Sequence, residues 1–140
     1  MSGWLVWAIL SAGFAALTAI FAKIGVEGVN SDYATFLRTI VVVVTLGFLV
    51  FATGKAQSLS SLSPRTLVFL VLSGLATGAS WLCYFRALKL GQAGQVAPVD
   101  KLSVVFVAVI AAAVLGEKYS ATGWAGIGLI SLGAVLVAVG

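Results

Sequence analysis

The sequence Gln92-Ala-Gly-Gln-Val-Ala-Pro-Val-Asp-Lys-Leu-Ser103 opens an apolar run that ends at Leu115-Gly-Glu-Lys118, and this stretch decides how the chain can fold. Residues 102–116 carry no charge, a run of 15 residues. A helical residue rises about 1.5 Å, so the run covers roughly 22 Å, less than the ~30 Å hydrocarbon layer of a membrane. A helix that crosses a membrane here must therefore draw Asp100 and Lys101 towards the bilayer interior.

An acid and a base at that depth predict a functional site. Ionisable side chains inside a membrane are costly, and they ordinarily face other helices or water, where a solute or an ion binds. Pro98 suits the first turn of the helix, where its missing N–H costs nothing. We predict that Asp100 and Lys101 bind substrate or couple a proton. The alternative is that both side chains reach the headgroups and anchor the helix end.

The composition of the whole chain indicates an integral membrane protein. Of its 140 residues, 61% are hydrophobic and 9% are charged, whereas soluble domains are about half apolar and about a quarter charged. The mean hydropathy is +1.18. The net charge of +4 comes from eight basic residues scattered singly between apolar runs, a pattern that does not form a nucleic-acid surface. We therefore expect a lipid bilayer around the chain and no nucleic acid as a partner.

The residue types present leave few routes to catalysis or metal binding. The chain has no histidine, and its one cysteine, Cys83, lies in an apolar segment. Thiolate metal sites, intrachain disulfides and most pairs of nucleophile and base lose their usual components. We expect a protein that is not an enzyme and that has no metal or other cofactor.

Charge-free windows divide the chain into five apolar segments. Extending the short second and fourth windows to membrane length predicts helices over 4–25, 33–53, 66–86, 96–115 and 120–139. The fold class expected is an all-α integral membrane protein with five transmembrane helices. We interpret residues 1–140 as a single domain.

Arg38 is another ionisable residue that the span lengths draw into the membrane. The uncharged window behind it, 39–54, has 16 residues and is too short to cross alone. An arginine inside a membrane must find a carboxylate, a carbonyl or water, and the acids nearest by topology are Glu27, Asp32 and Asp100. We predict that Arg38 belongs to the substrate or coupling site, with a snorkelling arginine at a helix end as the alternative.

Two of the expected helices place aromatic rings and hydroxyl groups on one face, which suits a solute cavity. Residues three or four apart share a helix face, and rings with polar tips hold a cation or an aromatic metabolite. Plain packing is the alternative for the first helix, and interfacial anchoring for Tyr84. The predicted cavity-lining residues are Ser11, Phe14, Thr18, Thr77, Trp81 and Tyr84.

The last expected helix carries Gly126 and Gly133 seven residues apart. Glycines at this spacing form a groove in which another helix packs closely. We predict that these glycines form a homodimer interface. A contact within one subunit is the alternative.

The basic residues give no preference for one orientation in the membrane. Five spans place the termini on opposite sides, and the loop-proximal basic residues then divide three against three. A chain without a preference can insert both ways, so two oppositely inserted copies can form an antiparallel dimer, which supplies the two halves of an inverted-repeat transporter with a midplane substrate site. The residues on the two sides are Lys55, Arg65 and Lys118, against Lys23, Arg86 and Lys89.

Several stretches resemble a known family. Tyr84-Phe-Arg-Ala-Leu-Lys-Leu-Gly-Gln-Ala-Gly-Gln-Val-Ala-Pro98 and the small-residue run that leads to Lys118 resemble the EamA domain of the drug/metabolite transporter superfamily. Gly126-Ile-Gly-Leu-Ile-Ser-Leu-Gly133 is similar both to that domain's last helix and to the dimerising helix of the small multidrug resistance proteins. The resemblance implies a multi-pass carrier of the bacterial or archaeal cytoplasmic (inner) membrane, with five helices per domain and usually two inverted domains per polypeptide.

The chain departs from the small multidrug resistance pattern in two ways. It has five expected helices in place of four, and its first helix lacks the membrane glutamate that binds proton and cation there. Asp100 is the acid placed to substitute for that glutamate, which is our inference from the residues.

These observations favour a secondary transporter of a small metabolite or drug-like solute that works as a homodimer, with proton coupling through Asp100 and with Lys101 or Arg38 as its counter-charge. The alternative is an accessory or scaffold membrane subunit that docks a partner protein through its last helix. The basic residues suit an anionic or zwitterionic solute, whereas Trp81 and Tyr84 suit a cationic or aromatic one.

Overall fold

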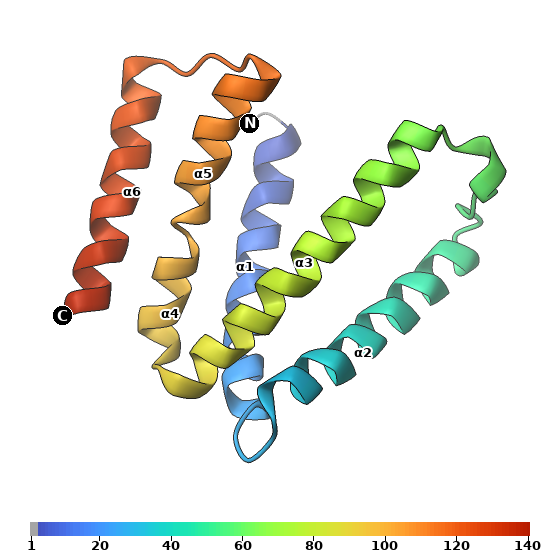
Figure 1. Ribbon diagram of the computed structural model, residues 1–140, viewed down its shortest axis with the longest axis horizontal. Coiled ribbons are helices and arrows are strands. Elements are labelled where there is room, and N and C mark those ends of the chain that lie inside the picture. Colours follow the sequence, from blue (N-terminus) through green and yellow to red (C-terminus); the bar gives the residue numbers. More distant parts are fainter. Residues whose placement is uncertain (1–2) are drawn as a thin grey trace. The chain divides into compact units, whose positions relative to one another are not determined.

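The structure, a computed structural model, describes residues 3–140 and holds helices and no strands within that range (Figure 1). The prediction of an all-α protein with five apolar spans is confirmed. Each of five helical segments is long and apolar enough to cross a membrane. They are α1 (Gly3–Gly25), α2 (Ser31–Ala52), α3 (Pro64–Leu90), the segment Ala93–Leu115 and α6 (Ala121–Val139).

Side-chain caps explain where two of these helices begin. The Asn30 side chain accepts hydrogen bonds from the backbone N–H groups of Asp32 and Tyr33, at 2.9 and 3.2 Å, so α2 begins at Ser31. Ser120 does the same for α6, because its hydroxyl accepts from the N–H of Gly123 at 3.1 Å. Such caps contribute about 1 kcal/mol each.

The fourth span is interrupted, where the sequence predicts one continuous helix over 96–115. It consists of α4 (Ala93–Asp100), α5 (Ser103–Ile110) and a wider π-helical turn, η2 (Ala111–Leu115). Lys101 and Leu102 form the turn between α4 and α5.

Pro98 lies three residues before this turn. The sequence places Pro98 in the first turn of a helix, but α4 already begins at Ala93 and Pro98 lies in its interior. A proline there removes a backbone donor and crowds the preceding turn. The chain continues through hydrogen bonds to the third residue back, such as Leu102 N–H to the Val99 carbonyl and Val104 N–H to the Lys101 carbonyl, each 3.0 Å.

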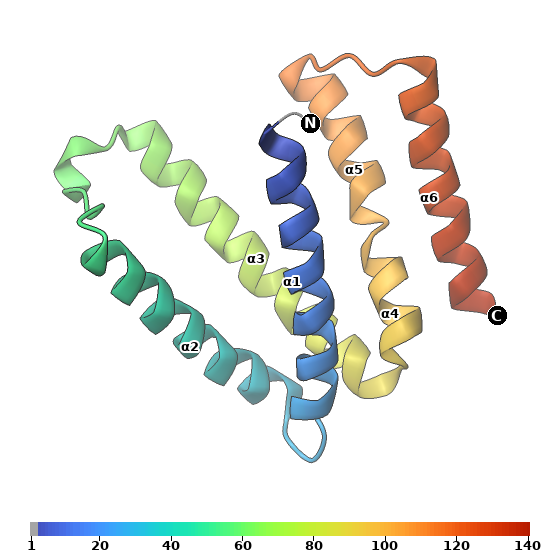
Figure 2. The same ribbon diagram turned by 180° about the vertical axis from the view of Figure 1, so that it is seen from behind.

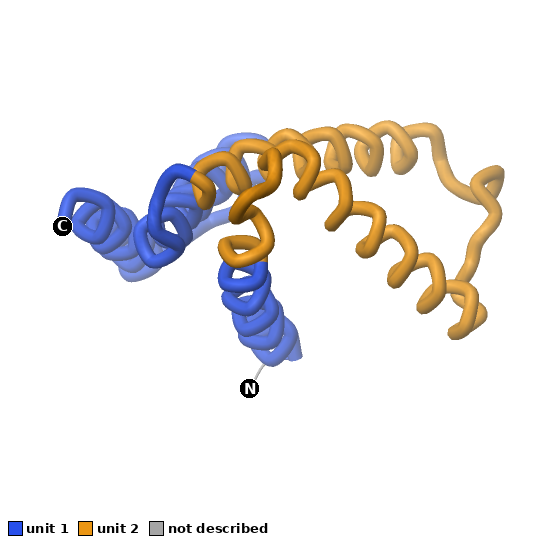
Figure 3. Tube along the Cα trace, turned by 90° about the horizontal axis from the view of Figure 1, so that it is seen from below, with its two compact units in different colours: residues 1–21, 90–140 blue, residues 22–89 orange. Residues whose placement is uncertain are grey.

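The described chain divides into two compact units (Figure 3). One unit contains the first part of α1, up to Phe21, together with Leu90–Gly140. The other contains Ala22–Lys89. The interpretation of residues 1–140 as one domain stays a prediction.

In the unit that contains Leu90–Gly140, α6 lies beside α4 and α5 (Figure 2). Three small residues of this unit, Ala108, Ala111 and Ala134, are buried. Helices in a membrane associate through close backbone packing, which small side chains allow. Gly116, with a φ of 70°, ends the segment, and the Glu117 N–H closes its last turn on the Ala111 carbonyl at 3.2 Å.

The unit Ala22–Lys89 is built on α2 and α3, which run antiparallel and are joined by a connector with a short 3₁₀ turn, η1 (Leu59–Ser61). Three of its basic side chains, those of Lys23, Arg86 and Lys89, contact backbone or carboxylate oxygens. The Lys23 ammonium donates to the Leu88 carbonyl at 2.7 Å, and Lys89 donates to the Val29 carbonyl. Phe85 and Leu88 are buried at the same end of α3.

Candidate functional site

Asp100 and Lys101 lie at the interruption of the fourth span. Asp100 is the eighth residue of Ala93–Leu115, so it lies about 10 Å along the helix from its start. The Lys101 Nζ is 3.4 Å from the Asp100 Oδ2, and the two side chains are 56% and 38% exposed. The two charges are therefore adjacent and accessible, and they occupy the place in the span where the regular helix is broken.

An interrupted span with a charged pair is chemically useful in a membrane. Irregular backbone is tolerated at membrane depth where it is buried in protein or lines a water-filled cavity. Discontinuous helices also form the substrate and ion sites of many transporters. The Asp100 carboxylate can accept a proton, and the adjacent Lys101 ammonium compensates its charge when the proton leaves.

Arg38 is the eighth residue of α2, again about 10 Å from the start of a span. Its guanidinium carbon lies 3.2 Å from the centre of the Trp81 ring and 5.7 Å from that of Phe85. A cation over an indole face is stabilised by roughly 0.5–2 kcal/mol, more when water is excluded. The structure thus brings together Arg38 and Trp81, two of the predicted site residues.

The guanidinium is incompletely satisfied. Its Nη1 is buried and has no hydrogen-bond partner in residues 3–140. Of the acids expected to reach Arg38, Asp32 is paired with Arg86 at 3.6 Å. Asp100 is paired with Lys101 and belongs to the other unit. The prediction that Arg38 is a counter-charge of Asp100 stays a prediction.

The six predicted cavity residues fall in separate units. Ser11, Phe14 and Thr18 lie on α1 before Phe21, with Phe14 exposed and Thr18 half-buried. Thr77, Trp81 and Tyr84 lie on α3; the Thr77 hydroxyl donates to the Ser73 carbonyl at 2.8 Å, and Trp81 and Tyr84 are half-buried. A cavity that they share stays a prediction.

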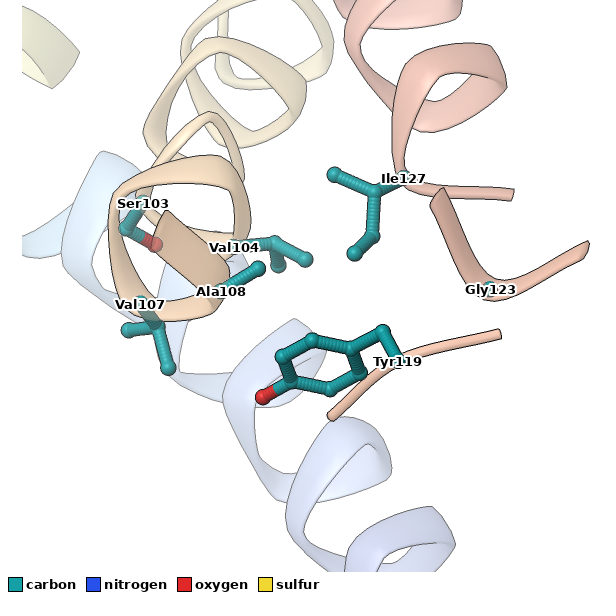
Figure 4. Close-up of a pocket in the computed structure, with 7 residues that line it drawn as sticks. All are labelled: Ser103, Val104, Val107, Ala108, Tyr119, Gly123 and Ile127. Atoms are coloured by element: carbon teal, nitrogen blue, oxygen red, sulfur yellow. The ribbon is translucent and has the colours of Figure 1, made fainter. Parts of the chain in front are cut away.

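A pocket of about 440 Å³ lies between α5 and α6 (Figure 4). Aliphatic side chains form most of its wall, and the Tyr119 ring lies across it. None of the six predicted cavity residues lines it. The sequence signal for it is the pairing of small residues, Ala108 and Gly123, on facing helices. Its lining residues are Ser103, Val104, Val107, Ala108, Tyr119, Gly123 and Ile127.

Tyr119 stands in the loop before α6, outside the spans. Its hydroxyl donates a hydrogen bond to Glu117, and its ring meets Trp124 edge-on with centroids 5.6 Å apart. The hydrogen bond raises the pKa of the Tyr119 phenol above its ordinary value, because the carboxylate accepts a hydrogen bond from the neutral phenol and repels a phenolate. Glu117 therefore has a hydrogen-bond partner two residues further along the chain.

Gly126 and Gly133 face open space. A Cβ atom built at either position meets no atom of the described chain within 4 Å. Among residues 3–140, therefore, no other helix packs directly on these two glycines. The homodimer interface stays a prediction.

The fold and these residues define a class, that of polytopic membrane proteins with ionisable side chains inside their spans. The sequence matches the EamA-like transporter family over residues 2–139, and the chain belongs to this family. It is also 57% identical over 136 residues to a protein of Sinorhizobium sp. named as an uncharacterized transporter in the cobO 3' region. That match covers 97% of this chain and 96% of the relative. No solved structure matches the chain. The protein is a membrane transporter.

Proposed function

We propose that this chain is a secondary transporter of a small metabolite or drug-like solute, coupled to protons through Asp100 and located in the bacterial or archaeal inner membrane. The observation that carries the proposal is the ion pair of Asp100 and Lys101, 3.4 Å apart at the interruption of a span. Family membership supports transport, and the ion pair supplies a proton-accepting group inside the membrane.

The coupling follows from charge balance. With Asp100 ionised, the pair has no net charge. When Asp100 takes up a proton, the Lys101 ammonium loses its counter-charge and the site becomes cationic, so its affinity for a charged solute changes. By linkage, the solute changes the proton affinity by the same factor.

The transporter works as an antiparallel homodimer in this proposal. Five helices in one copy provide one half of an inverted-repeat architecture, and a second, oppositely inserted copy supplies the other half. The open faces of Gly126 and Gly133 support α6 as the surface where the copies meet. Rocking of one copy against the other then exposes the site to each side in turn.

The test is transport by the purified chain in proteoliposomes with an imposed pH gradient. Amino acids, organic acids, nucleosides and organic cations are assayed one at a time, with protein-free vesicles as the control. We expect at least one class to accumulate, and dissipation of the gradient with a protonophore to stop that accumulation. If no class moves and a partner protein co-purifies with the chain, the accessory or scaffold function replaces this proposal.

A further inference from the structure

Among the basic residues of the unit Ala22–Lys89, Arg38 combines a position well inside a span with the lack of an ion pair within residues 3–140, whereas Lys55 and Arg65 lie at or beyond the ends of their helices. Lys23 and Lys89 donate to backbone carbonyls, and Arg86 is paired with Asp32. Arg38 lies about 10 Å inside a span, and in the described residues it forms no ion pair. Charged groups at such positions mark substrate or ion sites by default.

The geometry of Arg38 and Trp81 determines which ligand fits. With its carbon 3.2 Å from the ring centre, the guanidinium covers one face of the indole. Its five N–H donors point outward in the guanidinium plane, so stacking on a ring does not consume them. Two parallel N–H groups match the two oxygens of a carboxylate or phosphate.

The acids of the same unit do not fill this role. The unit contains two acidic residues, Glu27 and Asp32. Asp32 is paired with Arg86, and no ion pair joins Glu27 to Arg38 in the described chain. The buried Nη1 has no acceptor there, and an unsatisfied buried donor calls for a partner from outside the chain.

We infer that Arg38 binds an oxyanion of the transported solute, with Trp81 holding the guanidinium in place, so the solute carries a carboxylate or phosphate group. This inference rests on the proposed function, and it narrows the substrate class. From the sequence alone, Trp81 also suits a cationic solute. In the structure, the Arg38 guanidinium covers one face of the Trp81 ring and repels a second cation.

The direct test is binding, reported by Trp81 itself. The chain has four tryptophans, and Trp4→Phe, Trp7→Phe and Trp124→Phe leave Trp81 as the one reporter. The delipidated protein, in a neutral detergent without phosphate, is titrated with acetate, succinate or inorganic phosphate, and with tetramethylammonium as the cation. We expect a saturable change in Trp81 emission with at least one oxyanion and none with tetramethylammonium.

Variants of Arg38 identify the binding group. Arg38→Gln is expected to weaken oxyanion binding at least about tenfold, the scale of one lost charge-assisted hydrogen bond. Arg38→Lys keeps the charge and loses the paired donors, so we expect its affinity for the oxyanion to be intermediate. If Arg38→Gln folds poorly, Arg38→Lys is the variant that tests the inference. Arg65→Gln is the matched control, because Arg65 also lies beside a ring, Phe69 at 5.9 Å, but at the start of α3. Equal affinity of wild type and both Arg38 variants would overturn the inference.

The phosphate of a lipid headgroup has the same chemistry as a soluble phosphate. A second experiment therefore distinguishes a bound lipid from a bound solute. Phosphatidylcholine or a phosphate-free glycolipid is added to the single-tryptophan protein before the titration. Competition by soluble oxyanions in the presence of phosphatidylcholine supports a solute site. A response to phosphatidylcholine that no soluble oxyanion reverses would assign Arg38 to lipid and overturn the inference.

Transport separates failure of this inference from failure of the proposed function. If vesicles accumulate an organic cation and Arg38→Gln does not change the rate, the oxyanion site is wrong and the transporter stands. If the oxyanion binds to Arg38 but no solute crosses the membrane, the site stands and the proposed secondary transport fails.

Discussion

Asp100→Asn is expected to abolish proton-driven accumulation of solute while the protein remains folded and inserted. Asparagine has nearly the same shape but cannot bind and release a proton, so the site keeps one charge state throughout the cycle. Lys101 then stays without the counter-charge that lies 3.4 Å away in the wild type. Accumulation under a pH gradient should fall to the level of protein-free vesicles, measured by flux or by solid-supported membrane currents.

Glu117→Gln is the matched control for this change. Glu117 lies at the end of the fourth span, where it accepts a hydrogen bond from Tyr119, and it has no role in the proposed coupling. Its neutralisation should leave accumulation unchanged. If the Asp100→Asn protein accumulates solute as the wild type does, the coupling mechanism is wrong. If both variants lose accumulation, the effect is general damage to the protein.

The combined change Gly126→Leu and Gly133→Leu is expected to convert the dimer to monomers and to stop transport. Each leucine fills the groove into which the second copy packs. The fold of a single chain should survive, because a Cβ at either position meets no atom of the described chain within 4 Å. Crosslinking in membranes and light scattering in detergent measure the oligomeric state.

Gly128→Leu provides the comparison on the same helix. Gly128 also faces open space in the single chain, but two residues along a helix it points away from Gly126. It should leave both the dimer and transport intact. A monomer in wild type, or full transport by the monomeric double variant, would contradict the homodimer proposal.

The number of spans and the all-α membrane class of the protein can be predicted from the sequence, because both depend on local composition. Every charge that interrupts an apolar run is visible in the chain, and helices of about 20 residues are what a bilayer requires. The interruption after Asp100 is less visible. A proline perturbs the turn that precedes it, so Pro98 does not indicate a break after Asp100, and the helix start at Ala93 puts this proline in the interior and not in the first turn.

Side-chain contacts within the candidate site are harder to predict from the sequence. Periodicity assigns Arg38 to one face of α2 and Trp81 to one face of α3, but their contact depends on the register between two helices distant in sequence. The same holds for the carbonyl partners of Lys23 and Lys89. The position of a charge along a single span can therefore be predicted from sequence, whereas the pairing of side chains across helices requires the structure.

The depth of residue 100 tests the central claim most directly. A nitroxide is attached at Asp100→Cys in a Cys83→Ser background, because Cys83 is an exposed free thiol, and Lys118→Cys serves as the reference at the membrane edge. We measure collision with lipid-soluble oxygen and with a water-soluble nickel chelate in vesicles. The account predicts that position 100 lies well inside the phosphate level of Lys118 yet is still reached by the chelate through a water-filled cavity. A label at position 100 that lies at the same depth as the Lys118 reference would contradict it.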